Sequence, residues 1–421
     1  MTEEKKSMVP KLRFPEFTET WEQRELSSLS ELITKGTSPL SKRNDGDINF
    51  IKVENLDSFS GKILSCSKVS KEEHLTYLRR SILFKGDILF SIAGTLGRTA
   101  IVPEDILPAN TNQALAIIRT KNQDLRFLLA ALKSRTVTDF IKKNPTVGAQ
   151  PNLSLAQVGS LKIPYPARAE QEKIGEFFSQ LDTTITLHQR KLEGLSKLKK
   201  SLLQKMFPKN GSLEPELRFP GFIGDWEQRN LFDSIQKITD FRGRTPKKLG
   251  MEWSEKGIPA LSALNVKDGY IDLSQDIHFG NQKLYEKWMA GNELHKGQVL
   301  FTTEAPMGNV AQLPDNNKYI LSQRTIAFNV KKDILSEDFL AILLRSPSVF
   351  RELTALSTGG TAKGVSQKTL AGVKVRVPKL LEEQKEIAEL FSRMNGCITL
   401  HQRKLESLKK LKTSLLQQMF V

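Results

Sequence analysis

Side chains that can hydrogen-bond to nucleic acid gather in four stretches of the sequence, and each stretch has a counterpart in the other half of the chain. Arginine and lysine bind phosphates or guanine edges, amides match adenine, and glycines let the backbone approach a phosphate. In the first half the candidates are Thr37, Lys42, Arg43, Thr95, Arg98, Asn112, Gln113, Gln150 and Asn152. In the second half they are Arg242, Arg244, Thr245, Lys247, Lys248, Asn309, Gln323, Arg324 and Lys363. A solvated loop is the alternative for any one of them, but matching sets in both halves favour a shared role.

Patterns typical of catalysis or metal binding are weak in this sequence. His188 and His401 occupy equivalent positions, but no serine or cysteine nucleophile and no carboxylate pair stands beside them, so we interpret them as contacts between helices. The two cysteines, Cys66 and Cys397, are far apart and have no metal-ligand spacing. There is no Walker lysine motif and no Asp/Asn-Pro-Pro-aromatic motif of amino-methyltransferases. We therefore expect no catalytic residue and no metal site in this chain.

Composition indicates a globular protein with a polyanionic partner. A chain of 421 residues should form at least two domains. Its net charge of +16 favours nucleic acid as the partner. No apolar run approaches the roughly 20 residues that span a bilayer, and the charged N-terminus lacks the apolar core of a signal peptide. We expect a cytoplasmic protein that does not bind a membrane.

The chain contains two copies of one sequence repeat. LRFPEF followed by WEQR begins at Leu12 and returns at Leu217 as LRFPGF followed by WEQR. The segment 170–207 recurs at 383–420 with about two thirds of its positions identical. Between these matched ends the sequences diverge, although KGDILF at 85–90 still resembles KGQVLF at 296–301. Similar ends with different middles suggest a common frame that carries two variable readers.

The repeated segments are predicted to be long helices. Apolar residues follow steps of three and four, a pattern interrupted only at Lys199, and such a seam is typical of paired helices. The seam residues are Leu181, Ile185, His188, Leu192, Leu195, Leu202, Ile398, His401, Leu405, Leu408 and Leu415. We expect the two helices to pack antiparallel as a coiled coil with pseudo-two-fold symmetry. The alternative is that each helix packs on its own globular domain.

The globular parts are expected to be mixed α and β. Strands are predicted at 48–53, 87–92, 114–119 and 161–165 in the first half, and at 298–303, 326–330 and 373–377 in the second. Helices are predicted at 125–142 and 338–356. The resulting domain organisation is a globular domain at 1–169, a helix at 170–207, a second globular domain at 208–382 and a helix at 383–421.

The doubled helix, the LRFP and WEQR motifs and the KG(D/Q)(I/V)LF strand together resemble the specificity subunit of type I restriction-modification enzymes. The resemblance runs along essentially the whole chain. It implies two target recognition domains that each read one half of an asymmetric, bipartite site on double-stranded DNA, with helices that set the spacing. It also implies docking of two modification subunits, which use S-adenosylmethionine, and of two restriction subunits, which use ATP and Mg²⁺, so that this chain needs no cofactor.

Two other functions remain open at this point. A single-chain nuclease would need a cluster of carboxylates and lysine on a strand, and Pro103-Glu104-Asp105 and Pro314-Asp315 are poor matches. A scaffold protein would bind DNA without regard to sequence, and the salt and sequence dependence of binding would distinguish it.

Overall fold

A computed structural model describes residues 9–40, 44–143, 151–209, 211–274, 276–357 and 364–420. Its contacts divide the chain into two units: unit 1 contains residues 1–192 and 400–421, and unit 2 contains residues 193–399. Both divisions fall within the repeated helical segments. Each unit therefore combines one globular part with pieces of both long helices. None of the helices in the described ranges is both long and apolar enough to cross a membrane.

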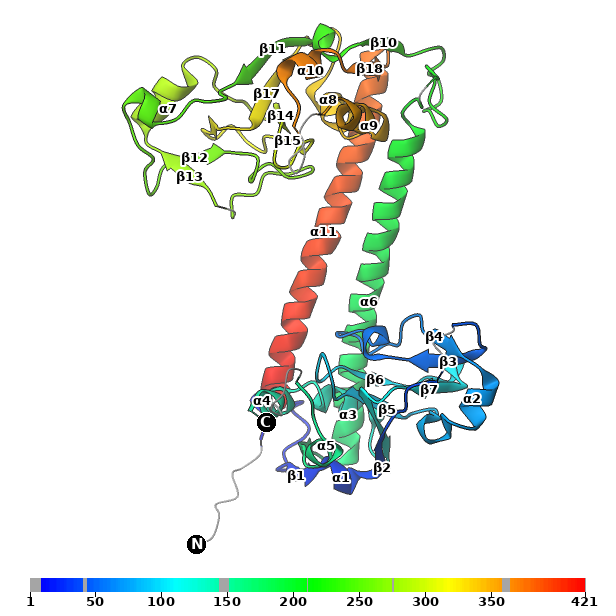
Figure 1. Cartoon of the computed structure of the whole chain (residues 1–421). Coiled ribbons are helices and arrows are strands. Elements are labelled where there is room, and N and C mark those ends of the chain that lie inside the picture. The colour runs from blue at the N-terminus through cyan, green and yellow to red at the C-terminus, as the bar shows by residue number, and fades with distance from the viewer. Residues whose placement is uncertain are drawn as a thin grey trace. The chain divides into compact units, whose positions relative to one another are not determined.

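The two long helices predicted from the repeat are present. They are α6 (Arg168–Lys205) and α11 (Leu381–Met419), shown in green and red in Figure 1. Within unit 1 they pair antiparallel, because Phe178 of α6 contacts Phe420 just beyond α11, whereas His188, further along α6, contacts His401, nearer the start of α11. His188 and His401 are equivalent residues of the duplication, and their Nδ1 atoms are 2.9 Å apart. A contact between equivalent residues is what a pseudo-two-fold axis between the helices produces.

The predicted seam faces inward. Ile185 is fully buried, and every other seam residue is half-buried. Lys199, which interrupts the apolar series on α6, is also half-buried, and its equivalent on α11, Lys412, is buried. All seam positions are thus at least half-buried, although lysines replace apolar residues at two of them.

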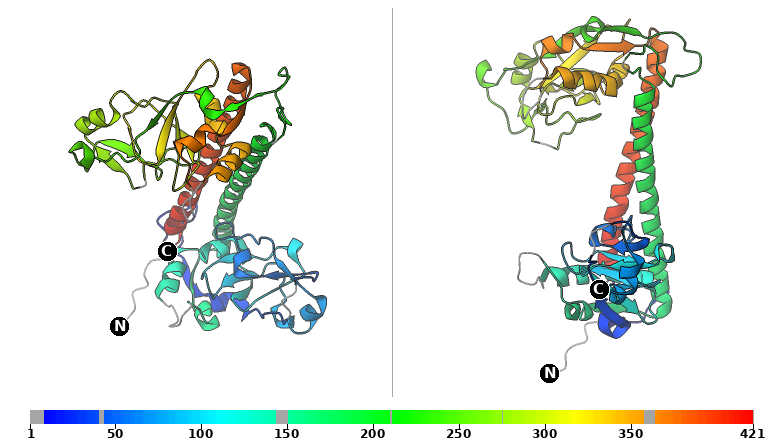
Figure 2. Two further views of the ribbon diagram at one scale, coloured as in Figure 1. Left: turned by 45° about the horizontal axis from the view of Figure 1, so that its top comes forward. Right: turned by 45° about the vertical axis from the view of Figure 1, so that its right-hand side comes forward.

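The globular part of unit 1 contains three small sheets. Strand order is β2-β8-β5-β6 in the central sheet and β4-β3-β7 in the second, while β1 pairs with β9. The second sheet and α2 lie on the side away from α6 (Figures 1 and 2). The strands are β1 (Glu22–Glu25), β2 (Ser30–Lys35), β3 (Ile48–Ile51), β4 (Ser67–Val69), β5 (Ile88–Ser91), β6 (Thr99–Ile101), β7 (Ala109–Thr111), β8 (Leu115–Thr120) and β9 (Lys162–Tyr165). The short helices are α1 (Leu26–Leu29), α2 (Lys71–Leu75), α3 (Leu125–Ala131), α4 (Arg135–Lys143) and α5 (Leu155–Gly159).

Unit 2 repeats this topology despite the divergence of its sequence. Its sheets have the orders β11-β17-β14-β15 and β13-β12-β16, and β10 pairs with β18. The strands are β10 (Glu227–Asn230), β11 (Ile235–Asp240), β12 (Ile258–Leu261), β13 (His278–Gly280), β14 (Val299–Thr302), β15 (Val310–Gln312), β16 (Ile320–Leu321), β17 (Thr325–Val330) and β18 (Lys374–Val377). The short helices are α7 (Gln282–Met289), α8 (Glu337–Leu343), α9 (Pro347–Leu356) and α10 (Gln367–Ala371). The mixed α and β class predicted from the sequence is confirmed in both units.

The single helices predicted at 125–142 and 338–356 are wrong in one respect, because each is two helices. In unit 2, Pro347 has no backbone N–H and begins α9, while the hydroxyl of Ser346 caps its first turn. In unit 1, Lys133 and Ser134 donate to carbonyls three residues earlier, which closes α3 before α4 begins. Local hydrogen bonding thus overrides a continuous helical pattern.

The duplicated motifs of each half form a buried ion pair. Glu170, 1% exposed, accepts hydrogen bonds from Arg13 Nε (2.7 Å), Arg13 Nη2 (2.8 Å) and Trp21 Nε1 (3.0 Å). The hydrogen bonds from Arg13 to Glu170 raise the pKa of Arg13 above its usual value. Unit 2 repeats the arrangement with Glu383, Arg218 and Trp226. The LRFP and WEQR motifs therefore anchor the start of each long helix to the globular part.

The end of each long helix completes the core of the globular part that belongs to the other repeat. In unit 1, the Phe420 ring lies 6.2 Å from Trp21 and 5.6 Å from Phe127, measured between ring centroids. In unit 2, Phe207 lies 5.8 Å from both Trp226 and Phe339. Neither repeat closes its own core, which explains why the helices keep similar sequences.

Candidate nucleic-acid interface

The loops that carry candidate DNA-binding residues meet at one edge of the central sheet in unit 1. The loops after β2 and β5 and the loop before β8 share this edge because β8 lies antiparallel between the other two strands. Asn152 reaches the same edge through a β-bridge to Ala93. The joining backbone hydrogen bonds run from Thr37 to Thr111 (2.9 Å), from Ile92 to Ala114 (2.9 Å) and from Leu153 to Ile92 (2.8 Å). Segments distant in sequence thus form one surface.

A glycine allows the closest of these approaches. A Cβ atom at Gly36 would lie 2.2 Å from the carbonyl oxygens of Thr111 and Asn112, so no side chain fits there. The following residue, Thr37, is half-buried, and its hydroxyl oxygen is buried without a hydrogen-bond partner among the described residues. Gly36 therefore brings the loop after β2 against the loop before β8.

The exposed side chains at this edge of unit 1 are mainly hydroxyls and amides. Thr95, Gln113 and Asn152 are exposed, whereas Asn112 is half-buried and accepts from the Ala114 N–H at 3.2 Å. Gln113 also hydrogen-bonds to the hydroxyl of Ser38. Lys42, Arg43 and Gln150 lie outside the described residues. The described part of this surface is suited to hydrogen-bonding with base edges.

The corresponding edge of unit 2 is cationic. Arg242, Lys247, Lys248 and Arg324 are exposed. Arg324 adopts a φ of 63°, which is unusual for a residue with a side chain, and its Nε lies 3.8 Å from a Glu304 carboxylate oxygen. The loop containing Lys363 reaches this edge at Gly364, but Lys363 itself lies outside the described residues.

Several candidates of unit 2 also hold the interface together. Arg244 donates to the Trp288 carbonyl and stacks 4.2 Å above the Phe241 ring. Gln323 Nε2 donates to the Arg244 carbonyl at 3.0 Å, although Gln323 remains exposed. The Thr245 hydroxyl accepts from the Lys248 N–H at 3.3 Å, and Lys248 Nζ donates to the Gly243 carbonyl at 2.7 Å.

Arg98 and Asn309, which are equivalent in the two halves, are tied to the protein backbone. Arg98 Nη1 lies 3.4 Å from the Val53 carbonyl and 3.3 Å from the Leu56 carbonyl. Asn309 Nδ2 donates to the Val266 carbonyl at 2.9 Å. Both side chains connect the interface to the segment that follows the first strand of the smaller sheet.

A family model described as the type I restriction modification DNA specificity domain matches the chain twice, over residues 18–197 and 223–410. The chain belongs to this family. A putative type I restriction enzyme MjaX specificity subunit of Methanocaldococcus jannaschii is 25% identical over 98% of this chain and 95% of its own length. The type I restriction enzyme EcoBI specificity subunit of Escherichia coli is 29% identical over 38% of this chain and 35% of its own length.

Solved structures of this specificity-subunit family share the fold. The S subunit of a type I restriction-modification system from M. genitalium aligns with a TM-score of 0.65 at 15% identity, and the alignment covers 98% of this chain and 99% of that one. A chain from a study of complex assembly and conformational transition of the type I R-M system aligns with a TM-score of 0.52 at 17% identity, covering 94% and 96%. The two-domain fold is therefore that of a specificity subunit.

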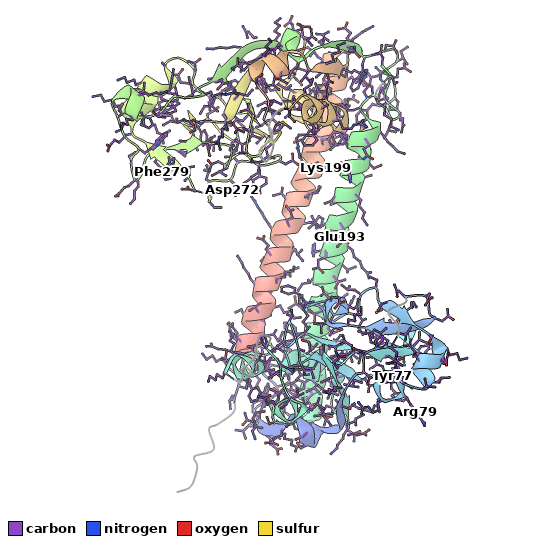
Figure 3. The ribbon with its side chains drawn as sticks, viewed as in Figure 1. Tyr77, Arg79, Glu193, Lys199, Asp272 and Phe279 are labelled. Atoms are coloured by element: carbon purple, nitrogen blue, oxygen red, sulfur yellow. The ribbon has the colours of Figure 1, made fainter. Side chains whose placement is uncertain are left out.

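One exposed segment of this specificity-family chain was not among the predicted candidates. Tyr77 is 49% exposed and lies close in sequence to the exposed Arg79 and Arg80, at an edge of unit 1 away from α6 (Figure 3). The buried Asn110 fixes this turn, since its Nδ2 donates to the Leu78 carbonyl at 2.9 Å and its Oδ1 lies 2.6 Å from His74 Nδ1. An aromatic residue close to two arginines is the sequence signal that could have revealed it.

Proposed function

We propose that this chain is the DNA-reading subunit of a type I restriction-modification complex, in which unit 1 and unit 2 each read one half of a bipartite target. The observation that carries this proposal is the repeated interface: one strand topology gathers the same loops in both units. Among the described residues the exposed side chains differ, with mainly amides and hydroxyls at this edge of unit 1 and mainly cations at the corresponding edge of unit 2. Unlike side chains on a common frame read unlike sequences, so the target is asymmetric.

The candidate residues are assigned to DNA contact in two roles. Exposed cations such as Arg242 and Lys247 bind phosphates or guanine, and exposed amides such as Gln113 and Asn152 bind base edges. Arg98 and Asn309 position the interface loops by hydrogen-bonding to backbone carbonyls. The paired α6 and α11 set the number of unread base pairs between the half-sites.

The long helices also offer a docking surface for partner subunits. Leu187 and Leu400 are equivalent in the duplication and are 59% and 67% exposed, and a second equivalent pair, Leu198 and Leu411, is also exposed. Exposed leucines at matching positions of both helices suit two copies of one partner. We assign this surface to two modification subunits, with two restriction subunits completing the complex.

Catalysis is assigned to these partners. S-adenosylmethionine, ATP and Mg²⁺ would be held by the modification and restriction subunits, and the complex would act on chromosomal DNA in the cytoplasm. Among the described residues the buried carboxylates are all engaged in ion pairs within the fold; they belong to Asp87, Asp124, Glu170, Asp182 and Glu383. They serve packing in this proposal and are not available for acid or base chemistry.

Reconstitution with the modification subunit tests the proposal. The chain, the modification subunit and S-adenosylmethionine are incubated with genomic DNA, and methylated bases are mapped by sequencing. The expected result is one two-part motif with unlike halves, and no modification by the chain alone. Methylation or cleavage by the chain alone would establish an enzyme instead, and binding indifferent to sequence would establish a scaffold.

Substitution of the exposed leucines tests the docking surface. Leu187→Glu with Leu400→Glu should prevent co-purification of the modification subunit and leave the unfolding temperature unchanged. Gln402→Glu, a change at an exposed position of the same helix, serves as the control. Normal co-purification of the double variant would show that the partner docks elsewhere.

A further inference from the structure

A buried lysine interrupts the apolar seam of the helix pair in unit 1. Lys412 of α11 is 4% exposed. Its Nζ donates to Asp182 Oδ1 of α6 at 2.5 Å and to the Phe59 carbonyl at 2.6 Å. Burying a charge is costly unless it is paired and hydrogen-bonded, and leucine would pack in such a seam without that cost. The position therefore calls for an explanation other than stability.

Lys412 joins three segments: the two long helices and the loop at residues 57–62. The loop is held in shape by Asp57, whose carboxylate accepts from the N–H and the hydroxyl of Ser60, each at 2.6 Å. Lys133 of the α3–α4 turn donates to the same Phe59 carbonyl at 3.0 Å. The loop is thus fixed to α11 at Phe59, whose carbonyl oxygen accepts from Lys412 and whose ring centroid lies 4.4 Å from Lys409 Nζ.

This loop leads directly to the candidate interface. The segment before it, residues 53–56, supplies the two carbonyls contacted by Arg98, which belongs to the loop after β5. A series of polar contacts, joined by the backbone of residues 53–59, therefore runs from Asp182 and Lys412 to Arg98 at the interface. Side chains that form such a series can transmit the position of the helices to the loops.

Unit 2 has related residues with a different pairing. Lys199 (Figure 3) is the equivalent of Lys412, and burial followed by the charge of Arg345 lowers its pKa. Arg345 pairs with Asp268, but the position equivalent to Asp182 is Asn395. The carboxylate that holds Lys412 thus has no counterpart on the helix of unit 2, so the contact through Lys412 is specific to unit 1.

We propose that Lys412 is a positioning residue that holds the DNA interface of unit 1 in register with the helix pair, and so fixes which gap between half-sites is accepted. The inference rests on the proposed two-part target. Lys412 touches no base in this arrangement. Its loss should relax the choice of gap and leave the sequences of both half-sites unchanged.

The decisive variant is Lys412→Met combined with Asp182→Leu. Replacing a buried ion pair by apolar residues is often neutral or stabilising, whereas Lys412→Met alone leaves a buried unpaired carboxylate. Lys412→Arg tests rescue by a residue that keeps the charge. Lys410→Met, at an exposed position on the same helix, is the matched control, and thermal unfolding verifies that all variants are folded.

Each variant is assembled with the modification subunit, and initial methylation rates are measured on duplexes whose gap is the preferred length or one base pair longer or shorter. One base pair shifts a half-site by roughly 3.4 Å and rotates it by roughly 35°. In the double variant we expect the ratio of the methylation rate at the preferred gap to the rate at the other gaps to fall about tenfold, equivalent to about 1.4 kcal/mol. Lys412→Arg should recover part of the preference, and Lys410→Met should retain all of it.

Two results would overturn the inference in distinguishable ways. If the double variant methylates all gaps more slowly by one common factor, the gap preference is unchanged and Lys412 has only a structural role. If the wild-type chain shows no gap preference because its motif has a single part, the proposed function fails and this inference fails with it.

Discussion

Removing the buried carboxylate of Glu170 should strongly destabilise unit 1. Glu170→Ala leaves the Arg13 guanidinium and the Trp21 indole N–H without their acceptor in a buried site. Breaking a buried ion pair by removing one partner costs about 3–5 kcal/mol. For a unit of this size each kcal/mol lowers the melting temperature by roughly 2–4 °C, so we expect a decrease of roughly 6–20 °C.

The matched control for this prediction lies two residues along the same helix. Glu172 also pairs with an arginine, Arg168, at 2.7 Å, but both side chains are about half exposed. Exposed helical pairs of this spacing contribute about 0.3–0.5 kcal/mol, so Glu172→Ala should hardly change the melting temperature. Differential scanning calorimetry of the full chain measures both variants. Equal melting temperatures for the two would refute the reasoning that Glu170 anchors the helix.

Three further predictions concern the helix pair and its surroundings. The pKa of His401 is lowered by partial burial and by the nearby charges of Lys191 and His188. The folded state therefore resists protonation, and unit 1 should lose stability as the pH falls below about 6.5. His188→Phe should weaken this pH dependence in thermal unfolding, and an unchanged profile would contradict the prediction. Burial lowers the pKa of Lys133 to about 7. Between about pH 7 and 10 the unfolded chain therefore binds more protons than the folded chain, and the free energy of unfolding should rise with pH. Lys133→Met should flatten this rise in urea unfolding, whereas an equal rise in the wild type and the variant would contradict the prediction. Inserting seven residues after position 194 and after the equivalent position 407 lengthens each helix by roughly 10 Å and should widen the target gap by roughly three base pairs; methylation mapping that shows altered half-sites would contradict the role of the helices as a spacer.

Local periodicity explains which parts of the fold were predictable. The long helices and their seam follow from apolar spacing, and the duplication shows directly that they are equivalent. The divisions at Ser134 and Ser346 were not predicted, because hydrogen bonds made within a single turn decide them. The ion pairs of Glu170 and Glu383 join residues more than 150 positions apart and leave no local pattern.

The candidate interface was predictable as a set of loops but not residue by residue. Matching positions in the two halves identified the loops that the sheet brings together. The role of Arg98 depends on carbonyls of residues 53–56, whose position only the fold determines. The same limit applies to Lys412, which in the sequence is one basic residue among several on α11 but in the fold is buried.

Exchange of the globular part of unit 2 tests most directly the central claim that each unit reads its own half-site. Residues 217–380 are replaced by the corresponding segment of another specificity subunit, the chain is assembled with its modification subunit, and the methylated motif is sequenced. Our account predicts that one half-site changes while the other half-site and the gap are retained. A motif altered in both halves would contradict independent reading by the two units.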